Sequence, residues 1–524
     1  MKLATSATIL FSILPAIVKS ATNGNTLRCV KPDTVDYSKD YFPDKIESEF
    51  SKLWEMEYYK TYKVLRNKKT DTSYALYQCG TELPAGVASQ HDGNWAVPLQ
   101  DGLALSQPAT VPQVEQLGIR RQVKGYMGPT TYISSPCMKT LAEEPTGSDG
   151  TKILEPIYEP GYYGGNTFNG TILSEFLETN PDIAILKTSG VGGNIINWNA
   201  YEEDGNKATF EWHKVMGSLF NLEKLANEQF EASSDRWDCV SDNAAYLQES
   251  ATSTSRRLSM PTTKPANVAE KSVVPRNLAD ASGRPTVLWA KTIYGGGGFD
   301  VARCDPEFEY YCELAEACSS TLLHSNDGTV ANPYTDGEFH MTTEEFIEFG
   351  KDADIWIIPD FLSGDLEEQY FWSNISEFKS VKSGNVYDVQ KSGGGAWFDQ
   401  RTAEYGKLAL SITTYSHHNT CQTNCISSFR PNNIDILLQD FCDVVGLYDD
   451  TVANHERLYF RKIMPSAEAE QPGNLGTCSS AVMDLPWETR AAECEFIRPE
   501  ESSAGAMKVM ASVLIAGLGS MLML

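Results

Sequence analysis

The chain has 524 residues, of which 70 are acidic and 43 basic, so its formal net charge is −27 at pH 7. This excess of negative charge disfavours nucleic acid as a partner, and also polyanionic ligands held by charge alone. The length is sufficient for about two to four domains.

Both ends of the chain carry targeting signals. Lys2 precedes the apolar stretch ATILFSILPAIV, and small residues near Ser20 suit cleavage, so residues 1–20 are read as a secretory signal peptide. The last residues, VMASVLIAGLGSMLML, are apolar but fewer than the ~20 that cross a bilayer comfortably. We therefore read 503–524 as a membrane-anchor signal for a glycolipid, with a single C-terminal membrane segment as the alternative. Either anchor would hold the protein on the extracellular side of the plasma membrane.

All twelve cysteines follow the signal peptide. Their spacings, such as C-x7-C-x5-C at Cys304, Cys312 and Cys318, do not match zinc-binding patterns. We therefore predict disulfides, as expected in an oxidising compartment, but their pairing is not readable from the sequence. Asn169 and Asn374 each begin a sequon for N-linked glycosylation.

Two similar segments lie in the two halves of the chain. EFLETNPDIAIL begins at Glu175, and EFIEFGKDADIWII begins at Glu345. In each, an acidic helix-forming stretch precedes an aspartate, Asp182 or Asp354, and then a short apolar strand. Such helix-then-strand units are typical of parallel α/β sheets, and their repetition predicts two similar α/β lobes.

The segment between these lobes has apolar residues at helical spacing. We predict one continuous helix within 207–232, because this stretch lacks proline and contains only Gly217 as a helix breaker. A polar, low-complexity stretch follows and predicts an exposed insertion. The predicted order after the signal peptide is a first lobe (21–206), a helix region (207–250), an insertion (251–285), a second lobe (286–462) and a Cys-containing extension (463–502).

The ordered series of these segments resembles the class III substrate-binding proteins, which receive ferric siderophores, haem, cobalamin or metal ions for uptake. The first lobe carries the resemblance in YALYQCGTELP, VPQVEQLGIRRQVKGYMGPTTYISSPC and EFLETNPDIAIL. The second lobe adds TVLWAKTIYGGGGFDVARCDPEFEYYCELAEAC, DADIWIIPD, VKSGNVYDVQKSGGGAWFDQR and NHERLYFRKI. The chain is most similar to the eukaryotic algal cell-surface branch, such as the ferrichrome-binding proteins of diatoms. The resemblance implies two Rossmann-like α/β lobes bridged by a long helix, a ligand cleft between the lobes, and neither enzymatic activity nor a resident cofactor.

Four glycine-containing loops, three of which follow predicted strands, would open at such a cleft, since α/β sheets bind ligands beyond the carboxyl ends of their strands. They are GPTTYISSPC, EPGYYGGNTF, YGGGGFD and SGGGAWFDQR. The last two lack the Lys-Ser or Lys-Thr of a phosphate-binding loop. Their aromatic, hydroxyl and guanidinium groups fit a large organic ligand better than a bare metal ion. The candidate ligand-binding residues are Tyr132, Ser134, Ser135, Tyr162, Tyr163, Tyr294, Trp397, Phe398 and Arg401.

We therefore expect a cell-surface receptor that captures a ferric siderophore or a similar iron chelate and passes it to a membrane transporter or to endocytosis. The first alternative is direct binding of a metal ion, haem or cobalamin by the same fold. Adjacent residues such as His417 and His418 seldom ligate one ion together, however, and His455 is expected to be a structural partner on a terminal helix. The second alternative is a secreted hydrolase, which no G-x-S-x-G or H-E-x-x-H motif supports.

Overall fold

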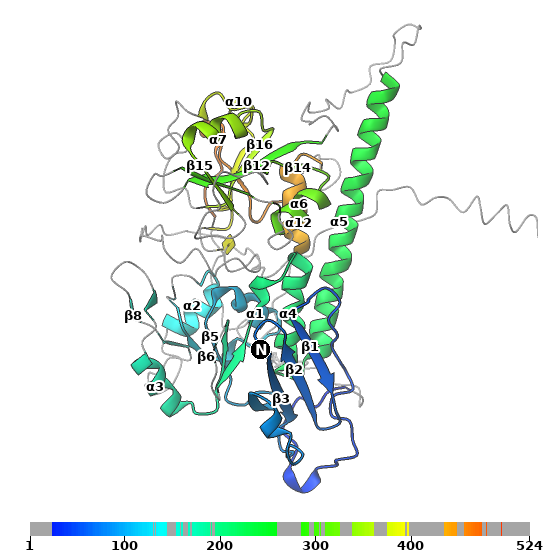
Figure 1. The fold of residues 1–524 in the computed structure, drawn as a ribbon, viewed down its shortest axis with the longest axis vertical. Helices are drawn as coiled ribbons and strands as arrows, with labels where there is room; N and C mark the ends of the chain where they lie inside the picture. Colours follow the sequence, from blue (N-terminus) through cyan, green and yellow to red (C-terminus); the bar gives the residue numbers. More distant parts are fainter. Residues whose placement is uncertain are drawn as a thin grey trace, which may run out of the picture.

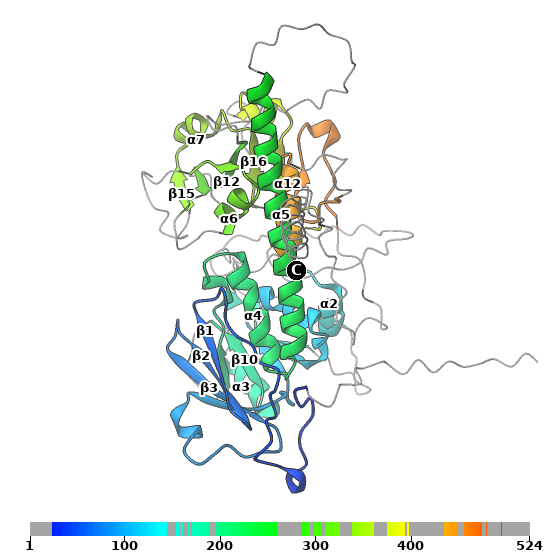
Figure 2. The same ribbon diagram turned by 90° about the vertical axis from the view of Figure 1, so that its right-hand side faces the viewer.

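A computed structural model shows two α/β lobes and a long helix that lies beside both of them (Figures 1 and 2). The predicted fold class, α/β, is confirmed. The structure describes residues 24–128, 130, 133–143, 154–157, 159–160, 166–167, 170–188, 190, 194–258, 284–292, 298–302, 304, 310–324, 338–360, 375–393, 396–397, 434–447, 455–473, 478 and 494.

The first lobe begins with a four-stranded sheet in the order β1-β2-β3-β4. The first three strands are antiparallel neighbours, and β4 runs parallel to β3. Leu65, Tyr74, Leu76 and Trp95 project from it into the core of the lobe. The sequence did not distinguish this sheet from the rest of the lobe. Its strands are β1 (Trp54–Tyr58), β2 (Tyr62–Asn67), β3 (Thr72–Gln78) and β4 (Gly93–Val97).

The second sheet of the first lobe is entirely parallel, in the order β11-β10-β5-β6-β7. Parallel neighbours need crossover connections, and helix α1 lies in the connection from β5 to β6 and helix α2 in that from β6 to β7. A two-stranded ladder, β8 (Glu159–Pro160) with β9 (Asn166–Thr167), follows β7 in the chain. The other elements are β5 (Leu103–Leu105), α1 (Val111–Gln116), β6 (Val123–Tyr126), α2 (Pro136–Glu143), β7 (Glu155–Pro156), α3 (Gly170–Thr179), β10 (Ala184–Lys187) and β11 (Ile195–Asn197).

The sheet of the second lobe has the order β15-β13-β12-β16-β17-β18, with β14 also paired to β12. Strands β12, β16 and β17 are parallel, whereas β13 and β18 pair antiparallel with this central set. The elements are β12 (Thr286–Thr292), β13 (Phe299–Ala302), α6 (Tyr310–Ala317), β14 (Thr321–Leu322), β15 (Glu338–Met341), α7 (Thr343–Gly350), β16 (Ile355–Ile358), α10 (Lys379–Lys382), β17 (Val386–Asp388), α12 (Ile434–Val444) and β18 (Arg461–Lys462). The single-turn helices that the structure describes in the two lobes are η1 (Pro32–Thr34), η2 (Ala88–Gln90), η3 (Pro108–Thr110), η4 (Arg120–Gln122), η6 (Ala200–Glu202) and η7 (Ser466–Glu468).

The two similar segments form the same unit in both lobes. Helix α3 leads into β10 of the first lobe, and α7 leads into β16 of the second, and both strands lie inside their parallel sets. The aspartates that precede the two strands differ in burial and in hydrogen bonding. Asp354 is buried and accepts hydrogen bonds from the backbone amide and the hydroxyl of Thr286, both at 2.8 Å, whereas Asp182 is exposed. The repeat therefore marks a shared backbone unit and not a shared side-chain function.

The predicted continuous helix within 207–232 is wrong, because the chain turns back in its middle. Helix α4 (Asn206–Ser218) and helix α5 (Glu223–Leu258) pack against each other across a short turn. Asn221 in this turn has a left-handed backbone, with φ of 58°, a conformation that asparagine tolerates better than most residues. A Cβ atom on Gly217 would lie 2.6 Å from the Cβ atom of Ala226, so the close approach of the two helices requires glycine there.

Helix α5 provides the long connection that the resemblance implies. Its 36 residues correspond to about 54 Å at the rise of an α-helix. It packs against α4 of the first lobe and against α6 and α12 of the second, and both views show it alongside the two lobes (Figures 1 and 2). The helix continues to Leu258, eight residues into the predicted insertion, of which 259–283 lie outside the described residues.

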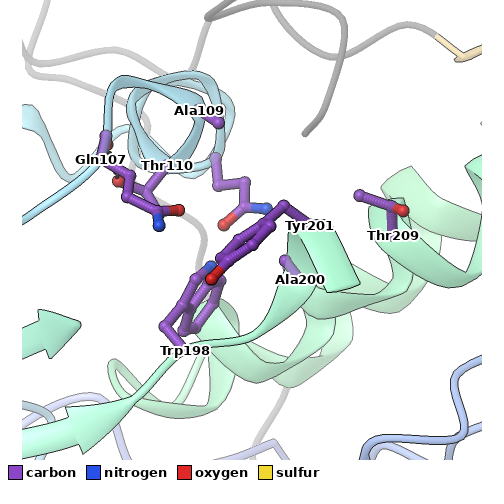
Figure 3. Close-up of a pocket in the computed structure, with 8 residues that line it drawn as sticks. Gln107, Ala109, Thr110, Trp198, Ala200, Tyr201 and Thr209 are labelled. Carbon is purple, nitrogen blue, oxygen red and sulfur yellow. Dashed lines mark hydrogen bonds between the residues drawn. The ribbon is translucent and has the colours of Figure 1, made fainter. Parts of the chain in front are cut away.

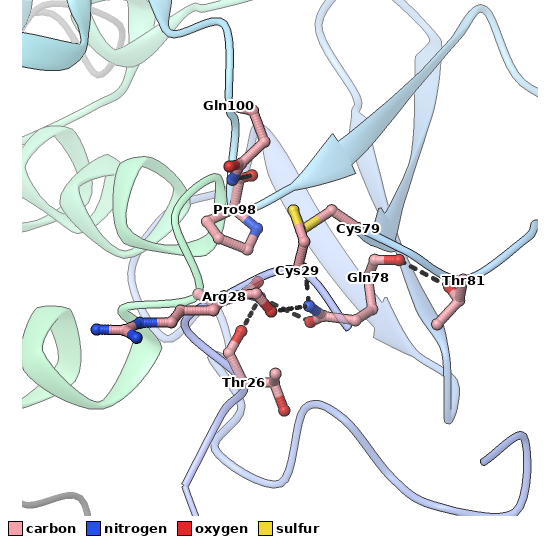
Figure 4. The surroundings of a disulfide bond; sticks show 9 residues. Thr26, Arg28, Cys29, Gln78, Cys79, Thr81, Pro98 and Gln100 are labelled. Carbon is pink, nitrogen blue, oxygen red and sulfur yellow. Dashed lines mark hydrogen bonds between the residues drawn. A yellow bond between two sulfur atoms is a disulfide. The ribbon is translucent and has the colours of Figure 1, made fainter. Parts of the chain in front are cut away.

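Five disulfides confirm the predicted use of ten of the cysteines and indicate an oxidising compartment. The Cys29–Cys79 bond fixes the N-terminal segment to the end of β3, where the Gln78 side-chain amide also donates to the Arg28 carbonyl at 2.8 Å (Figure 4). The other pairs are Cys137–Cys478, Cys239–Cys494, Cys304–Cys312 and Cys318–Cys442.

The predicted signals at the chain ends lie outside the described residues, as do Cys421, Cys425 and the sequons at Asn169 and Asn374. Among the helices that the structure describes, none has both the length and the apolar character that crossing a membrane requires. The extracellular anchor therefore stays a prediction from the sequence.

Candidate ligand-binding site

The carboxyl ends of β5, β10 and β11 bring polar residues to one edge of the parallel sheet in the first lobe. Gln107 follows β5, Thr188 follows β10 and Trp198 follows β11. These three strands are neighbours and parallel, so the residues after them gather at the same edge. This is the edge at which α/β sheets generally bind ligands.

A narrow hollow lies at this edge (Figure 3). Its volume is about 10 Å³, which is room for roughly one water molecule. Side chains from the segment after β5 and from the segment between β11 and α4 enclose it. The lining residues are Gln107, Ala109, Thr110, Gln113, Trp198, Ala200, Tyr201 and Thr209.

Tyr201 contributes a neutral hydroxyl group to this hollow. Burial, and after it the nearby Glu202 carboxylate, raises the pKa of Tyr201 to about 12, while hydrogen bonds with Thr188 and Gln107 act in the opposite direction. The hydroxyl donates to Glu202 Oε1 at 2.9 Å. Burial also pushes the pKa of Glu202 upward, but hydrogen bonds from Lys69, Tyr201 and Asn199 together lower it. At neutral pH this edge therefore carries an uncharged phenol beside an ionised carboxylate.

Gln113 is the lining residue with unused hydrogen-bonding capacity. Its side chain is only 2% exposed, and its Oε1 has no hydrogen-bond partner among the residues that the structure describes. A buried polar atom without a partner is costly, so a donor group placed in the hollow would be favoured. The sequence analysis did not select Gln107, Gln113 or Tyr201. The available signal was the polar stretch SQPAT directly after the apolar strand LAL.

Ser134 and Ser135, two of the predicted site residues, lie just before helix α2. The Ser135 side chain is buried; its hydroxyl donates to the Glu115 carboxylate and accepts the backbone amide of Met138 at 3.2 Å. This arrangement caps the first turn of α2 and ties it to α1. Ser134 is half-buried and has interactions of its own. A ligand contact by either serine stays a prediction.

Trp397 lies in the core of the second lobe and not on an open face. The side chain is 1% exposed, and its ring centre lies 5.3 Å from that of Phe460, 5.9 Å from Trp289 and 6.0 Å from Tyr459. The sequence analysis expected this ring to present a wide contact surface to the ligand. The structure instead favours a packing role, because Trp289 of β12 and the segment just before β18, both distant in the sequence, pack against the ring. The remaining predicted residues, Tyr132, Tyr162, Tyr163, Tyr294, Phe398 and Arg401, lie outside the described residues.

His455 is a structural partner, as predicted, but residues 455–460 form no helix, so the expected terminal helix is wrong. Its Nε2 atom bonds to Asp440 of α12, and the same carboxylate accepts the backbone amides of Leu458 at 2.8 Å and Tyr459 at 2.6 Å. His417 and His418 lie outside the described residues. Within the part of the chain that the structure describes, no three His, Cys, Asp or Glu side chains are grouped so as to hold a metal ion.

A second hollow, of about 210 Å³, lies along the first half of α5. Its Arg236 already pairs with Asp435 of α12 at 2.6 Å, and Ser233 donates to the same carboxylate at 3.0 Å. These bonds join α5 to the second lobe, so the polar groups at this end of the hollow serve the contact between helices. Its lining residues are Gln116, Phe210, Leu225, Glu228, Gln229, Ala232, Ser233 and Arg236.

No protein-family model matches the chain, and no curated protein matches it. Among solved structures, it is similar to a periplasmic haem-binding protein from Pseudomonas aeruginosa, with 13% identity and a TM-score of 0.36 over 57% of this chain and 85% of that one. It is also similar to the siderophore-binding protein FhuD from Vibrio cholerae bound to Fe3+-Desferal, with 14% identity and a TM-score of 0.34 over 57% and 93%. A third is an Fe3+-hydroxamate transport protein from Saccharomonospora viridis, with 14% identity and a TM-score of 0.33 over 55% and 84%. Likenesses this low carry no conclusion about the ligand of this chain.

Proposed function

We propose that the chain captures an iron chelate, such as a ferric siderophore, in the space between its two lobes, as a binding protein and not as an enzyme. The observation that carries this proposal is that the carboxyl edges of both parallel sets flank one contact between the lobes. Asn206, the first residue of α4, follows the carboxyl end of β11 and donates its side-chain amide to the Tyr310 carbonyl of α6 at 3.0 Å.

The start of helix α6 lies on the carboxyl side of its own sheet. The helix leads back to β14, which pairs with the amino end of β12 through Thr286 and Thr321. Tyr310 at its other end packs edge-on against Trp289, with ring centres 6.2 Å apart. The carboxyl edges of the parallel strands in the two lobes therefore border the same region, and we propose that the ligand lies there.

The groups at the first-lobe edge suit an organic chelate. The Gln113 amide and the Tyr201 hydroxyl are neutral hydrogen-bonding groups beside the indole of Trp198. A few polar groups against an aromatic surface are typical of sites for drug-sized organic molecules. Because the hollow holds only about one water, the chelate would contact its rim and occupy the space between the lobes.

The cellular context is a further part of this proposal. The disulfides support passage through an oxidising compartment. Retention at the cell surface by the C-terminal signal, delivery to a transporter or to endocytosis, and kinship with the algal receptors rest on the sequence alone. Haem, cobalamin and free metal ions stay as alternative ligands.

The test is a titration of the secreted chain, 21–501, followed by tryptophan fluorescence. Ferric hydroxamates, haem, cobalamin and free metal ions are added separately, with the iron-free hydroxamate as the control. We expect saturable quenching by a ferric chelate, since Trp198, although buried, lines the hollow that borders the proposed contact. Quenching by none of these ligands, together with turnover of an ester, phosphate or glycoside substrate, would favour the hydrolase instead.

A further inference from the structure

The narrow hollow at the carboxyl edge of the first lobe contains a buried acceptor without a partner. Gln113 lines the hollow, and its Oε1 atom has no hydrogen-bond partner among the described residues. The Tyr201 hydroxyl does not satisfy this atom, because it donates its hydrogen to Glu202. Thr110 and Thr209 also line the hollow, and they donate their hydroxyl hydrogens to backbone carbonyls at 2.6 and 2.9 Å. A group that enters the hollow and satisfies Gln113 must therefore bring its own donor.

The size of the hollow limits which donor groups fit. Its volume of about 10 Å³ is room for roughly one water molecule, so only a terminal group of that size enters. A primary ammonium group and a hydroxyl group both meet this limit. An amide does not, because its N–H is attached to a carbonyl group that needs further space. The rest of a ligand would stay outside the hollow.

The walls of the hollow favour the ammonium group over the hydroxyl group. Trp198 and Tyr201 both line it, and Figure 3 shows their rings there. The face of an aromatic ring attracts a cation, and tryptophan attracts it most strongly. Among the described lining residues, none carries a positive charge that would repel it. The Glu202 carboxylate behind Tyr201 is paired with Lys69 at 2.9 Å, so the two rings and the Gln113 oxygen supply most of the attraction.

The hollow lies close to the contact between the lobes. Its lining residue Thr209 follows Asn206 by three positions on helix α4, which corresponds to a rise of about 4.5 Å. The side-chain amide of Asn206 donates to the Tyr310 carbonyl of the second lobe at 3.0 Å. A chelate between the lobes therefore needs only a short arm to reach the hollow.

We propose that the hollow is a subsite for a primary ammonium group on a short arm of the chelate, so that the protein selects amine-bearing ferric chelates. This inference rests on the proposed function and names the class of chelate that the site takes. The ammonium group donates to Gln113 Oε1 between the rings of Trp198 and Tyr201, while the iron-binding part stays between the lobes. A chelate whose outer surface offers only carboxylate or carbonyl oxygens leaves Gln113 without a donor. The net charge of −27 acts in the same direction at longer range, because it attracts a cationic ligand.

The experiment compares three ferric trihydroxamates that share one iron-binding core and differ only at the end of one alkyl arm. The arm ends in an ammonium group, in a hydroxyl group or in an N-acetylated amine. Tryptophan fluorescence of the secreted chain, 21–501, measures the dissociation constant of each. The titrations are run at neutral pH, where a primary amine is protonated. The same three chelates are then titrated against Gln113→Leu and against Gln90→Leu, a matched change at an exposed position.

We expect the parent protein to bind the ammonium chelate about tenfold more tightly than the acetylated one, the size of one charge-assisted hydrogen bond. Gln113→Leu should remove most of this preference, and Gln90→Leu should keep it. Binding of the acetylated or the hydroxyl chelate as tight as that of the ammonium chelate would overturn the subsite and leave the proposed function intact. Binding of none of the three would overturn both for this class of chelate. The comparison on the parent protein decides even if Gln113→Leu does not fold.

Discussion

The Glu313 carboxylate of the second lobe accepts the backbone amide of Asn206, the first residue of helix α4 in the first lobe, at 2.6 Å. It also accepts the side-chain amide of Asn206 at 2.7 Å. The N-terminus of a helix exposes unpaired amide groups and the positive end of the helix dipole, which an anionic acceptor stabilises. One lobe therefore caps a helix of the other, and a change in lobe orientation must break this cap.

Replacement of this carboxylate should loosen the contact between the lobes. We expect Glu313→Ala to lower the free energy of unfolding by about 1 kcal/mol, as typical for loss of a helix cap. Urea denaturation followed by circular dichroism measures this difference. Glu316→Ala, an exposed position on the same helix, is the matched control. Equal stability of the two variants would show that the cap contributes nothing.

Trp397 offers a test of packing against ligand contact. Because the side chain is 1% exposed among other aromatic rings, Trp397→Ala should cost about 3–5 kcal/mol of stability. The fraction that stays folded should bind the chelate with nearly unchanged affinity. Thermal melting and ligand titration on the same sample separate the two effects, with the exposed Tyr37→Ala as control. Loss of an aromatic side chain that contacts the ligand would weaken the affinity for the chelate ~30-fold. If Trp397→Ala showed such a loss with an unchanged melting temperature, Trp397 would belong to the site after all.

His213 should make the protein sensitive to acid. Burial lowers the pKa of His213 from 6.5 to about 4, with a hydrogen bond to Gln229 opposing this. Between these values the unfolded chain binds a proton that the folded chain does not, so the free energy of unfolding falls as the pH drops through this range. The full difference is about 3 kcal/mol. Urea denaturation at pH 4 to 8 measures the free energy of unfolding at each pH. We expect it to change less steeply with pH in His213→Gln than in the parent protein. If the free energy of unfolding depended on pH equally in the two proteins, His213 would not be the source of the acid sensitivity.

Gln113 should affect binding and not folding. Gln113→Leu removes the amide oxygen that has no partner among the described residues. We expect the affinity for the ferric chelate to fall about tenfold, the size of one hydrogen bond from a buried group. Stability should hold or rise slightly, since a buried polar atom is lost. Gln90→Leu, at an exposed position, is the matched control. If both variants bound the ferric chelate with the same affinity, Gln113 would not be part of the site.

Arg401 lies outside the described residues and stays a prediction from the sequence. If it pairs with an oxygen of the chelate, Arg401→Ala should weaken binding, by an amount that grows with the burial of the pair. Fluorescence titration measures the affinity, and Arg66→Ala, at an exposed position of strand β2 in the first sheet, is the control. Equal affinities in the two variants would place Arg401 elsewhere.

The sequence alone predicted those helices and strands whose pattern is contained within a short segment. The apolar runs at Ala184 and Ile355 predicted buried parallel strands correctly, because strands covered on both faces are nearly continuously apolar. The helix break near Asn221 was missed since the apolar spacing continues through the turn, and one glycine seldom ends a helix by itself. The deciding contact, between Gly217 and Ala226, exists only after the chain has folded back.

The candidate site depends on contacts between residues that are far apart in the sequence. Gln113 and Tyr201 meet only because β5, β10 and β11 are neighbours, and this order is not visible in the sequence. The sequence analysis assigned Trp397 to the cleft because it follows a run of glycines. Such a run is compatible with either an exposed or a buried indole ring. Its burial depends on Trp289 and Phe460, which come from other strands and segments.

The bond between Cys137 and Cys478 has a consequence for biosynthesis. The two cysteines are 341 residues apart, whereas Cys29 and Cys79 are separated by only 50. At ordinary rates of translation, Cys137 must wait roughly 20–70 s for its partner to be made. Cys239 emerges in that interval and waits for Cys494, and Cys318 waits for Cys442, so the nascent chain carries several reactive thiols that can pair wrongly. We expect maturation to depend on a disulfide isomerase, and to finish only after nearly the whole polypeptide has entered the oxidising compartment.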